Sequence, residues 1–544
     1  MLRTLLHGCV AASAALLAAP AHGVTINTGV SVGPMVQRWG WDTKGGSSRF
    51  NTVAKASVAY NGTPANLLRA PIEPTFHNPD GTINLSQYNS DIAAIRNVLQ
   101  VNPNVEVFAS VKLRGGDTFP EWLGAATPDW PAGTGSIFSN PSPRPNPELY
   151  SELVANYVEM LRDEGIDIDY LGLNNETDGA LGVNRYIATA RMLRNELETR
   201  GVPTEYRDFQ LVGPDTFGLG TAETILASVA SENALDTIDI IGSHFYPQHN
   251  SGSANQWGNL ADDYGKPLWH TEVHMPIGND QYDGIREQAI RDTLSVLFAS
   301  NREGVDSFVW WGYASDQNAV GQWVKAEVIN TTLGATPVST TPGFSAKSDP
   351  TGEPLYQAYV EDGRVSLWVS NPGDTLDDVA VNLDDGFLRL PGVAGPFDTN
   401  LATFRDARTG AGATITSALL PDADGQGFVI DSIPASAVGV ITFNVATPGD
   451  VNIDGVIDAA DVQALTTGWL SSQPVGDYNS WRRGDLDQDG TVNLSDFLIL
   501  RGAMPADQHG SLAAAFAALG VPEPGTLSLV VGLLACGLRS RRQR

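Results

Sequence analysis

Leu171-Gly-Leu-Asn-Asn-Glu-Thr-Asp178 is an apolar, β-rich run with a glutamate at its end, and Lys266-Pro-Leu-Trp-His-Thr-Glu-Val273 repeats this pattern further along the chain. Each run has the composition of a strand in a parallel barrel, where the carboxyl ends of the strands carry the active-site side chains. We therefore expect Glu176 and Glu272 to meet on one face. A carboxylate pair placed in this way is what cleavage of a glycosidic bond requires.

Strand patterns of this kind alternate with helical ones through the first part of the chain. Helical spacing is clearest in Leu149–Leu161 and in Ile187–Leu197. Eight alternating strands with helices between them predict an α/β fold, a (β/α)8 TIM barrel over residues 24–329. An open nucleotide-binding sheet would call for a G-x-G-x-x-G turn, and none is present. The expected strands are Val36–Trp41, Asn66–Ile72, Val105–Val111, Ile168–Leu173, Phe209–Pro214, Ile238–His244, Pro267–Glu272 and Val305–Trp311.

After the barrel, the pattern of strands alternating with helices gives way to strands alone. A linker rich in Thr, Pro, Ser and Gly spans residues 330–352, and alternating runs such as Arg364–Pro372 and Ala437–Phe443 follow it. They predict an adjoining β-sandwich over residues 353–446. We expect residues 24–34, which precede the first barrel strand, to pair into this sandwich.

Composition bounds the function. Of the 544 residues, 17% are charged, yet the net charge is −29. A surface that binds nucleic acid needs clustered Lys and Arg, and none occurs outside the C-terminal tip, so no nucleic acid is expected as a partner. The balance suits an exported, solvated protein.

Both ends of the chain have the features of targeting segments. Residues 1–23 combine a basic start, a short apolar run and a small-residue cleavage site, as in a secretory signal peptide. Residues 521–544 join Val521-Pro-Glu-Pro524 to a short apolar run and an arginine cluster. This tail resembles the PEP-CTERM sorting signal, which implies a Gram-negative bacterium, cell-surface sorting and only transient membrane contact. The alternative is a weak tail anchor. The two cysteines, Cys9 and Cys536, lie inside these segments.

A repeated loop of 12 residues follows the sandwich. The copies begin at Asp450 and Asp485, 35 residues apart, with glycine at position 6 for a sharp turn and a backbone carbonyl offered by position 7. Oxygen ligands at this spacing suit a calcium ion, and two copies in register disfavour a chance pair of polar surface turns. The expected ligands are Asp450, Asn452, Asp454, Val456, Asp458 and Asp461, and Asp485, Asp487, Asp489, Thr491, Asn493 and Asp496.

Residues 449–505, with a helical pattern after each loop, resemble a type I dockerin, a small α-helical module related to the EF-hand. The resemblance implies two Ca²⁺ ions and a cohesin-type protein partner. Position 12 of each loop is Asp instead of the usual Glu. Ala459-Ala460 and Leu494-Ser495 stand where dockerins often carry a symmetric Ser/Thr pair, which leaves the partner's identity open.

The spacing of the two glutamates agrees with the strand order. The separation is 272 − 176 = 96 residues, three barrel units of about 30 residues each. Asn175-Glu176 after the fourth strand, Ser243-His-Phe-Tyr-Pro247 on the sixth and Glu272 on the seventh resemble clan A retaining glycoside hydrolases. Within that clan the chain is most similar to family 30, through Leu68-Arg-Ala-Pro-Ile72, Pro120-Glu-Trp-Leu123, Lys266–Glu272 and Ser307-Phe-Val-Trp-Trp311.

The resemblance implies a retaining β-glycosidase that hydrolyses a polysaccharide by double displacement and needs no catalytic cofactor. Glu176 would be the general acid/base and Glu272 the nucleophile. An ionised Glu272 close by would keep Glu176 protonated for the first step. The substrate-binding residues would be Asn175 at the sugar 2-hydroxyl, Tyr246 and Arg69 beside Glu272, Trp311 and Trp122 against sugar rings, and His244.

Each of these interpretations has a competitor. His244 could be a hydrogen-bonded core residue, Tyr246 and Arg69 could serve packing and a salt bridge, and Trp311 could belong to the barrel core. His270 and His274 flank Glu272 as in some zinc sites, but that pattern needs a helix, and a strand is expected here.

At the level of the whole chain, the main alternative is a non-catalytic carbohydrate-binding or cohesin-docking scaffold. A neighbouring clan A family is another. The basic pair Lys112 and Arg114 could favour an acidic sugar, or could be ordinary loop charges.

Overall fold

The computed structural model describes most of the chain between its two ends. The segments predicted as a signal peptide and as a sorting signal lie outside the described residues, apart from Gly23, as do Lys112, Arg114 and part of the linker. The described residues are 23–43, 49–111, 119–126, 133–135, 142–176, 182–246, 253–275, 286–311, 319–343, 353–384, 388, 396–397, 400–409, 411–422, 426–447, 449–454, 456–474, 478–487 and 489–518.

The predicted barrel is confirmed. Eight strands close in the order β10-β11-β2-β3-β4-β7-β8-β9, and every neighbouring pair is parallel. They are β2 (Arg38–Asp42), β3 (Leu67–Ile72), β4 (Glu106–Val111), β7 (Tyr170–Gly172), β8 (Gln210–Thr216), β9 (Ile240–His244), β10 (Leu268–Val273) and β11 (Val305–Trp310).

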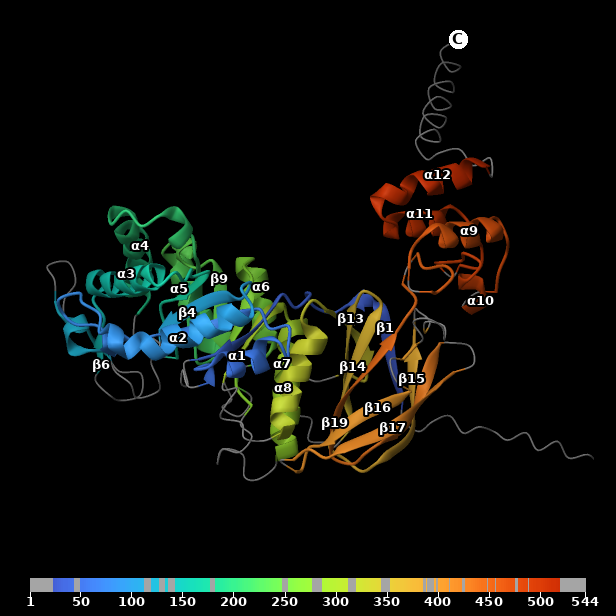
Figure 1. Cartoon of the computed structure of the whole chain (residues 1–544), viewed down its shortest axis with the longest axis horizontal. Coiled ribbons are helices and arrows are strands. Elements are labelled where there is room, and N and C mark those ends of the chain that lie inside the picture. The colour runs from blue at the N-terminus through green and yellow to red at the C-terminus, as the bar shows by residue number, and fades with distance from the viewer. Residues whose placement is uncertain are drawn as a thin grey trace, which may run out of the picture.

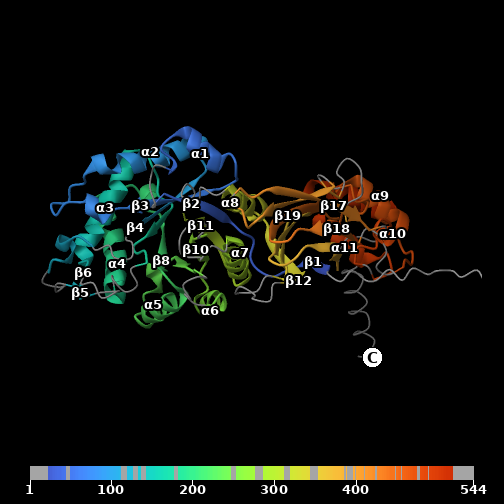
Figure 2. The same ribbon diagram turned by 90° about the horizontal axis from the view of Figure 1, so that it is seen from below.

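Helices lie around this barrel (Figure 2). The segments with helical spacing, 149–161 and 187–197, each lie within one of these helices. Their apolar side chains are buried in the core between helices and strands, which accounts for the spacing. The helices are α1 (Val53–Tyr60), α2 (Leu85–Val101), α3 (Pro147–Asp163), α4 (Val183–Thr199), α5 (Leu219–Ser231), α6 (Asn255–Tyr264), α7 (Arg286–Arg302) and α8 (Ala319–Thr332). Short elements between strands and helices are η2 (Pro74–Phe76), η3 (Glu121–Gly124), the hairpin β5 (Gly133–Gly135) and β6 (Ser142–Arg144), η4 (Thr204–Tyr206) and η5 (Leu235–Thr237).

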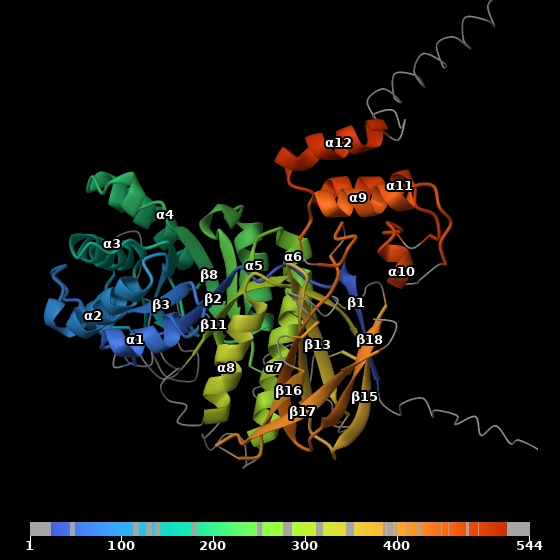
Figure 3. The same cartoon turned by 45° about the vertical axis from the view of Figure 1, so that its right-hand side comes forward.

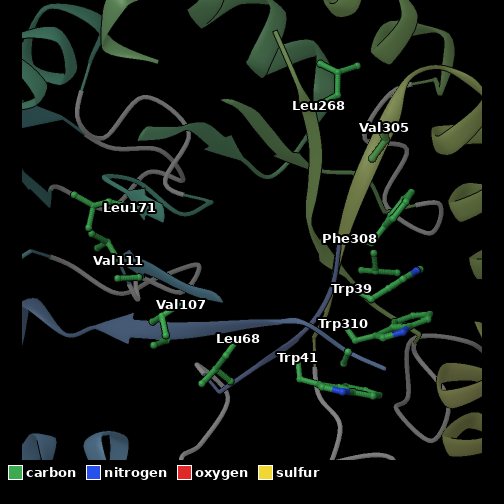
Figure 4. Packing of buried hydrophobic residues seen from close by; sticks show 14 of the residues in the cluster. Trp39, Trp41, Leu68, Val107, Val111, Leu171, Leu268, Val305, Phe308 and Trp310 are labelled. Atoms are coloured by element: carbon green, nitrogen blue, oxygen red, sulfur yellow. The ribbon is translucent and has the colours of Figure 1, made fainter. Parts of the chain in front are cut away.

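Side chains alternate across the barrel wall. Outward-facing aromatics such as Trp39, Trp310 and Phe308 stack on one another, with ring centroids 4.9–5.3 Å apart (Figure 4). Leu67, Phe108 and Trp269 point inward and belong to a buried cluster inside the barrel, near the amino ends of the strands. The inward residue two positions further along each of these strands is polar: Arg69, Ser110 and Thr271.

The adjoining β-structure is also confirmed. Nine strands follow one another in the closed order β1-β12-β13-β14-β19-β16-β17-β18-β15. They are β1 (Gly23–Ser31), β12 (Thr336–Thr341), β13 (Leu355–Glu361), β14 (Arg364–Asn371), β15 (Leu376–Leu383), β16 (Leu401–Asp406), β17 (Thr414–Pro421), β18 (Gly427–Ile433) and β19 (Ala437–Asn444).

The N-terminal strand β1 joins this structure beside the strands of the C-terminal half (Figure 3). It pairs antiparallel with β12 and parallel with β15. The β-structure packs against the barrel helices α7 and α8. There the Trp368 indole N–H donates to the Thr331 hydroxyl at 2.9 Å and the Trp368 ring lies near Phe298 and Trp323. These contacts brace the barrel from the side of its last two helices.

The C-terminal region is small and helical (Figure 1), and its apolar side chains form a separate buried core. Its helices are α9 (Ala459–Gly468), α10 (Tyr478–Trp481), α11 (Leu494–Ala503) and α12 (His509–Ala518), with η7 (Ala506–Gln508) before the last. The two loop copies fold alike: Asp461 and Asp496, at position 12, accept N–H groups of their own loops and complete a capping box on α9 and α11. Among the described residues, no helix is both long and apolar enough to cross a membrane.

Candidate active site

The polar layer at the carboxyl ends of the strands forms the candidate site. Glu176 follows β7, and its backbone has a φ of 54°, in the left-handed region. Glu272 lies on β10. Oxygens of the two carboxylates and a ring nitrogen of His244 all lie within 4.8 Å of one another. The structure thus brings together the glutamates that the strand ends predicted.

Both carboxylate oxygens of Glu272 accept a hydrogen bond. Arg69 Nη1 donates to Oε2 at 3.0 Å, and the Tyr246 hydroxyl donates to Oε1 at 2.5 Å. Glu272 is 6% exposed. A buried carboxylate with a guanidinium on one oxygen and a hydroxyl donor on the other is held in a fixed orientation.

Glu176 is the more open of the two, with 21% of its side chain exposed. Its Oε1 lies 3.1 Å from the Tyr246 hydroxyl and 3.1 Å from His244 Nδ1. Tyr246 has a single O–H, so a proton that it gives to Glu272 is not also given to Glu176. Burial, with the charges of Glu272 and Glu176, raises the pKa of Tyr246 well above its usual value, so the phenol keeps that proton.

His244 lies between three carboxylates. It is fully buried, with Nε2 3.2 Å from Asp215 Oδ1 and 3.7 Å from Glu272 Oε2. Burial by itself lowers the pKa of His244, but the combined effect of Glu272, Asp215 and Glu176 outweighs it and raises the pKa to about 9. At neutral pH the ring is therefore an imidazolium.

Arg69 connects the floor of the site. Its Nη2 donates to Asp215 at 2.6 Å and to Asn175 Oδ1 at 2.8 Å, and its Nη1 reaches Asp42 at 3.4 Å. Burial lowers its pKa, but Asp215, Asp42 and Glu272 together hold it above its ordinary value. Asn175 is consequently fixed beside the two glutamates.

The predicted tryptophans differ in placement. Trp311 is half-buried, and its ring stands edge-on to His274, which in turn lies edge-on to Tyr246. Trp310, its neighbour, faces the outer core. Trp122 lies in η3 and is partly buried against the barrel core.

The alternative zinc cluster of His270, Glu272 and His274 does not form in the part of the chain that the structure describes. His270 Nε2 accepts the N–H of Phe245 at 3.1 Å, and burial together with His244 lowers the pKa of His270 to about 3, so it stays neutral. Within the described ranges, the acidic or histidine groups close enough to share a metal are Glu176, His244 and Glu272, and Asp485, Asp487 and Asp489.

That second group fits the predicted calcium loop. Asp485 is fully buried, and burial with the neighbouring acids raises its pKa to about 6. Three converging carboxylates in one loop repel one another unless a cation joins them, and oxygen donors are what Ca²⁺ prefers. Asp485, Asp487 and Asp489 would hold such an ion.

Sequence reasoning missed four residues of the site: Asp42, Ser110, Asp215 and Thr271. Asp215 was lost because β8 was expected to end at Pro214, whereas it runs to Thr216. An acid at a strand end is the signal that identified both glutamates, and the same criterion applied to β2 and β8 finds Asp42 and Asp215.

Comparisons with known proteins agree with this geometry. The family model described as glycosyl hydrolase family 59 matches residues 103–333, and the model for the dockerin type I domain matches residues 448–504. No curated protein sequence matches the chain. The chain is thus a glycoside hydrolase of the clan A kind with a type I dockerin region at its C-terminal end.

Several solved structures share the fold. A family 30 endoxylanase from Clostridium papyrosolvens is 17% identical, with a TM-score of 0.53 over 78% of this chain and 100% of that one. The family 30 subfamily 8 xylanase Xyn30A from Clostridium acetobutylicum is also 17% identical, with a TM-score of 0.53 over 78% and 99%. SrfJ from Salmonella typhimurium is 15% identical, with a TM-score of 0.52 over 78% and 93%. At these identities the likeness is one of fold.

Proposed function

We propose that the barrel is a retaining β-glycosidase that hydrolyses O-glycosidic bonds of a polysaccharide. The observation that carries this proposal is the separation of Glu176 and Glu272, with carboxylate oxygens within 4.8 Å and one hydroxyl between them. Retaining enzymes hold their carboxyl groups about 5–5.5 Å apart, whereas inverting enzymes leave about 6.5–9.5 Å for a water molecule.

In the first step, Glu176 donates its proton to the glycosidic oxygen while Glu272 attacks the anomeric carbon, so that the bond to the leaving sugar breaks as a glycosyl ester forms. In the second, Glu176 takes a proton from water, the resulting hydroxide attacks the anomeric carbon, and Glu272 leaves as a carboxylate. Arg69 and Tyr246 stabilise Glu272 as the anion in which it starts and ends the cycle.

Asn175 would donate its amide N–H to the sugar 2-hydroxyl, since its Oδ1 already accepts from Arg69. Trp311, half-buried beside His274, offers a flat surface for a sugar ring. Trp122 would act further out, at a subsite. Family 30, which matches in fold, and family 59, which matches in sequence pattern, are both candidate families for the barrel.

The remaining regions would serve attachment and export. We propose a barrel over residues 24–329, of which residues 24–34 pair into the sandwich, and a linker over 330–352, which supplies β12 to the sandwich. A β-sandwich over 353–446 and a dockerin over 449–505 would follow. The dockerin would bind two Ca²⁺ ions through the twelve loop residues and dock to a cohesin-type partner outside the cell. The ends, at 1–23 and 521–544, would direct export and sorting at the surface of a Gram-negative bacterium.

Hydrolysis of a panel of β-linked polysaccharides by the full chain tests this function, with Glu176→Gln and Glu272→Ala run in parallel. Release of sugar by the parent and its loss in both folded variants is expected. The anomeric configuration of the first product, followed by NMR, should be retained. If one glycan is bound but not cleaved, and both variants bind it equally well, the protein is a carbohydrate-binding scaffold instead.

A further inference from the structure

Asp215 occupies a special position at the carboxyl end of β8. It is fully buried and has a φ of 52°, in the left-handed region that L-residues seldom adopt. Its carbonyl accepts the backbone N–H of Glu176 at 3.0 Å. Backbone strain that a fold retains is commonly found at functional sites, because the surrounding contacts must hold it in place.

The Asp215 carboxylate is surrounded by donors on both oxygens. Oδ2 accepts from Arg69 Nη2 at 2.6 Å and from the Ser110 hydroxyl at 3.1 Å. Oδ1 accepts from the Thr271 hydroxyl at 2.5 Å and lies 3.2 Å from His244 Nε2. Asp215 therefore touches both cations of the site.

Those two cations in turn touch both glutamates. Arg69 donates to Glu272, and His244 lies 3.1 Å from Glu176 through Nδ1 and 3.7 Å from Glu272 through Nε2. Asp215 is thus linked to the two glutamates through Arg69, through His244 and through the Glu176 backbone N–H.

We propose that Asp215 is a positioning residue that holds Arg69 and the imidazolium form of His244 against the two glutamates. The inference rests on the proposed function only in taking Glu176 and Glu272 as the reacting groups. An imidazolium has two N–H donors, and the contacts place Nε2 toward Asp215 and Nδ1 toward Glu176. Without the Asp215 charge, burial favours the neutral ring of His244, which carries only one N–H. If that proton is on Nε2, Nδ1 has no proton to donate to Glu176.

The charge of His244 depends on groups from every strand around it. Glu176 faces it from the end of β7, Asp215 from β8, Tyr246 from beyond β9, and Glu272 and neutral His270 from β10. Arg69, on β3, shares Asp215 and Glu272 with it. Removing one of the three carboxylates leaves burial, which favours the neutral ring, less opposed.

The test is an NMR titration of histidine-labelled full-length protein, comparing the parent with Asp215→Asn. His244→Gln identifies the His244 signal among the 8 histidines. In the parent, His244 should titrate near 9. In Asp215→Asn the midpoint should fall by about 1–3 pH units, the usual effect of one nearby opposite charge.

Asp42→Asn is the matched control, because Asp42 is a buried aspartate that also pairs with Arg69, whereas the ion pairs of His244 are with Glu176, Asp215 and Glu272. Its His244 midpoint should move by less than the midpoint in Asp215→Asn, since the Coulomb energy between two charges falls with their separation. An unchanged midpoint in Asp215→Asn, or an equal shift in Asp42→Asn, would overturn the proposal. Asp215→Ser removes the same charge if the amide does not fold.

Kinetics supply the second readout. Asp215→Asn should lower kcat by about 100-fold with KM changed less than about 3-fold, as expected when reacting groups are misplaced. A kcat in Asp215→Asn equal to that of the parent would refute the positioning role. If the folded parent cleaves no glycan, the proposed function fails, while the titration still decides the role of Asp215.

Discussion

Replacement of Arg69 by glutamine gives the most direct physical test of the site. The guanidinium lies 2.6 Å from Asp215, 3.0 Å from Glu272 and 3.4 Å from Asp42, and all of it is buried. Glutamine keeps part of the volume and removes the charge. Removing one partner of a buried ion pair costs about 3–5 kcal/mol, because it leaves an uncompensated charge behind.

Proton uptake by a neighbouring aspartate limits how much folding free energy the Arg69→Gln variant loses. A folded variant can protonate one of the aspartates, Asp42 or Asp215, at about 1.4 kcal/mol for each pH unit above the ordinary aspartate pKa of about 4. That is about 4 kcal/mol at pH 7 and about 1.4 kcal/mol at pH 5. The folded variant then binds one more proton than its unfolded chain, so its stability falls as pH rises.

Denaturant unfolding of Arg69→Gln and parent at pH 5 and pH 7 measures this difference. The destabilisation should be larger at pH 7 by about 2–3 kcal/mol, following the proton uptake above. Arg38→Gln is the matched control. Arg38 pairs with Glu106 at the amino ends of β2 and β4, where both side chains are partly exposed to solvent. A pair of this kind contributes about 1 kcal/mol or less to stability. A loss at Arg69 no larger than at Arg38, or one larger at pH 5, would refute the reasoning.

Three further outcomes follow. Tyr246→Phe removes the hydroxyl that lies between Glu272 and Glu176. Steady-state kinetics should show kcat lowered by about 10–100-fold at similar KM, which is the effect of losing one hydrogen bond to a charged group. An unchanged kcat would contradict a role of this hydroxyl in catalysis. Gly242→Ala would place a Cβ 2.6 Å from Val212 and 2.8 Å from Thr271, so thermal unfolding should report a loss of about 1–3 kcal/mol; full stability would show that the barrel interior has room there. Removal of Ca²⁺ with EDTA should expose residues 448–504 to proteolysis and abolish partner binding while glycan hydrolysis continues; equal loss of hydrolysis would show that the two regions depend on each other.

The local pattern of the chain was sufficient to predict the barrel. Runs such as Ile238–His244 and the helical spacing in 149–161 specify strand and helix, since each periodicity buries its apolar face in only one kind of element. The same holds for the loops that begin at Asp450 and Asp485, where ligand spacing is written within 12 consecutive residues. Glu176 and Glu272 were predictable because a barrel brings all strand ends to one face.

The network beneath the glutamates depended on tertiary structure. Arg69 pairs with Asp215 across 146 residues and with Glu272 across 203, separations over which no local pattern operates. The charge of His244 likewise follows from three carboxylates supplied by different strands, against the effect of burial. The spacing of residues along one element is enough to predict a strand, a helix or the order of ligands in a loop. Closure of the barrel determines which charged side chains become neighbours, and their proximity determines which of them are protonated.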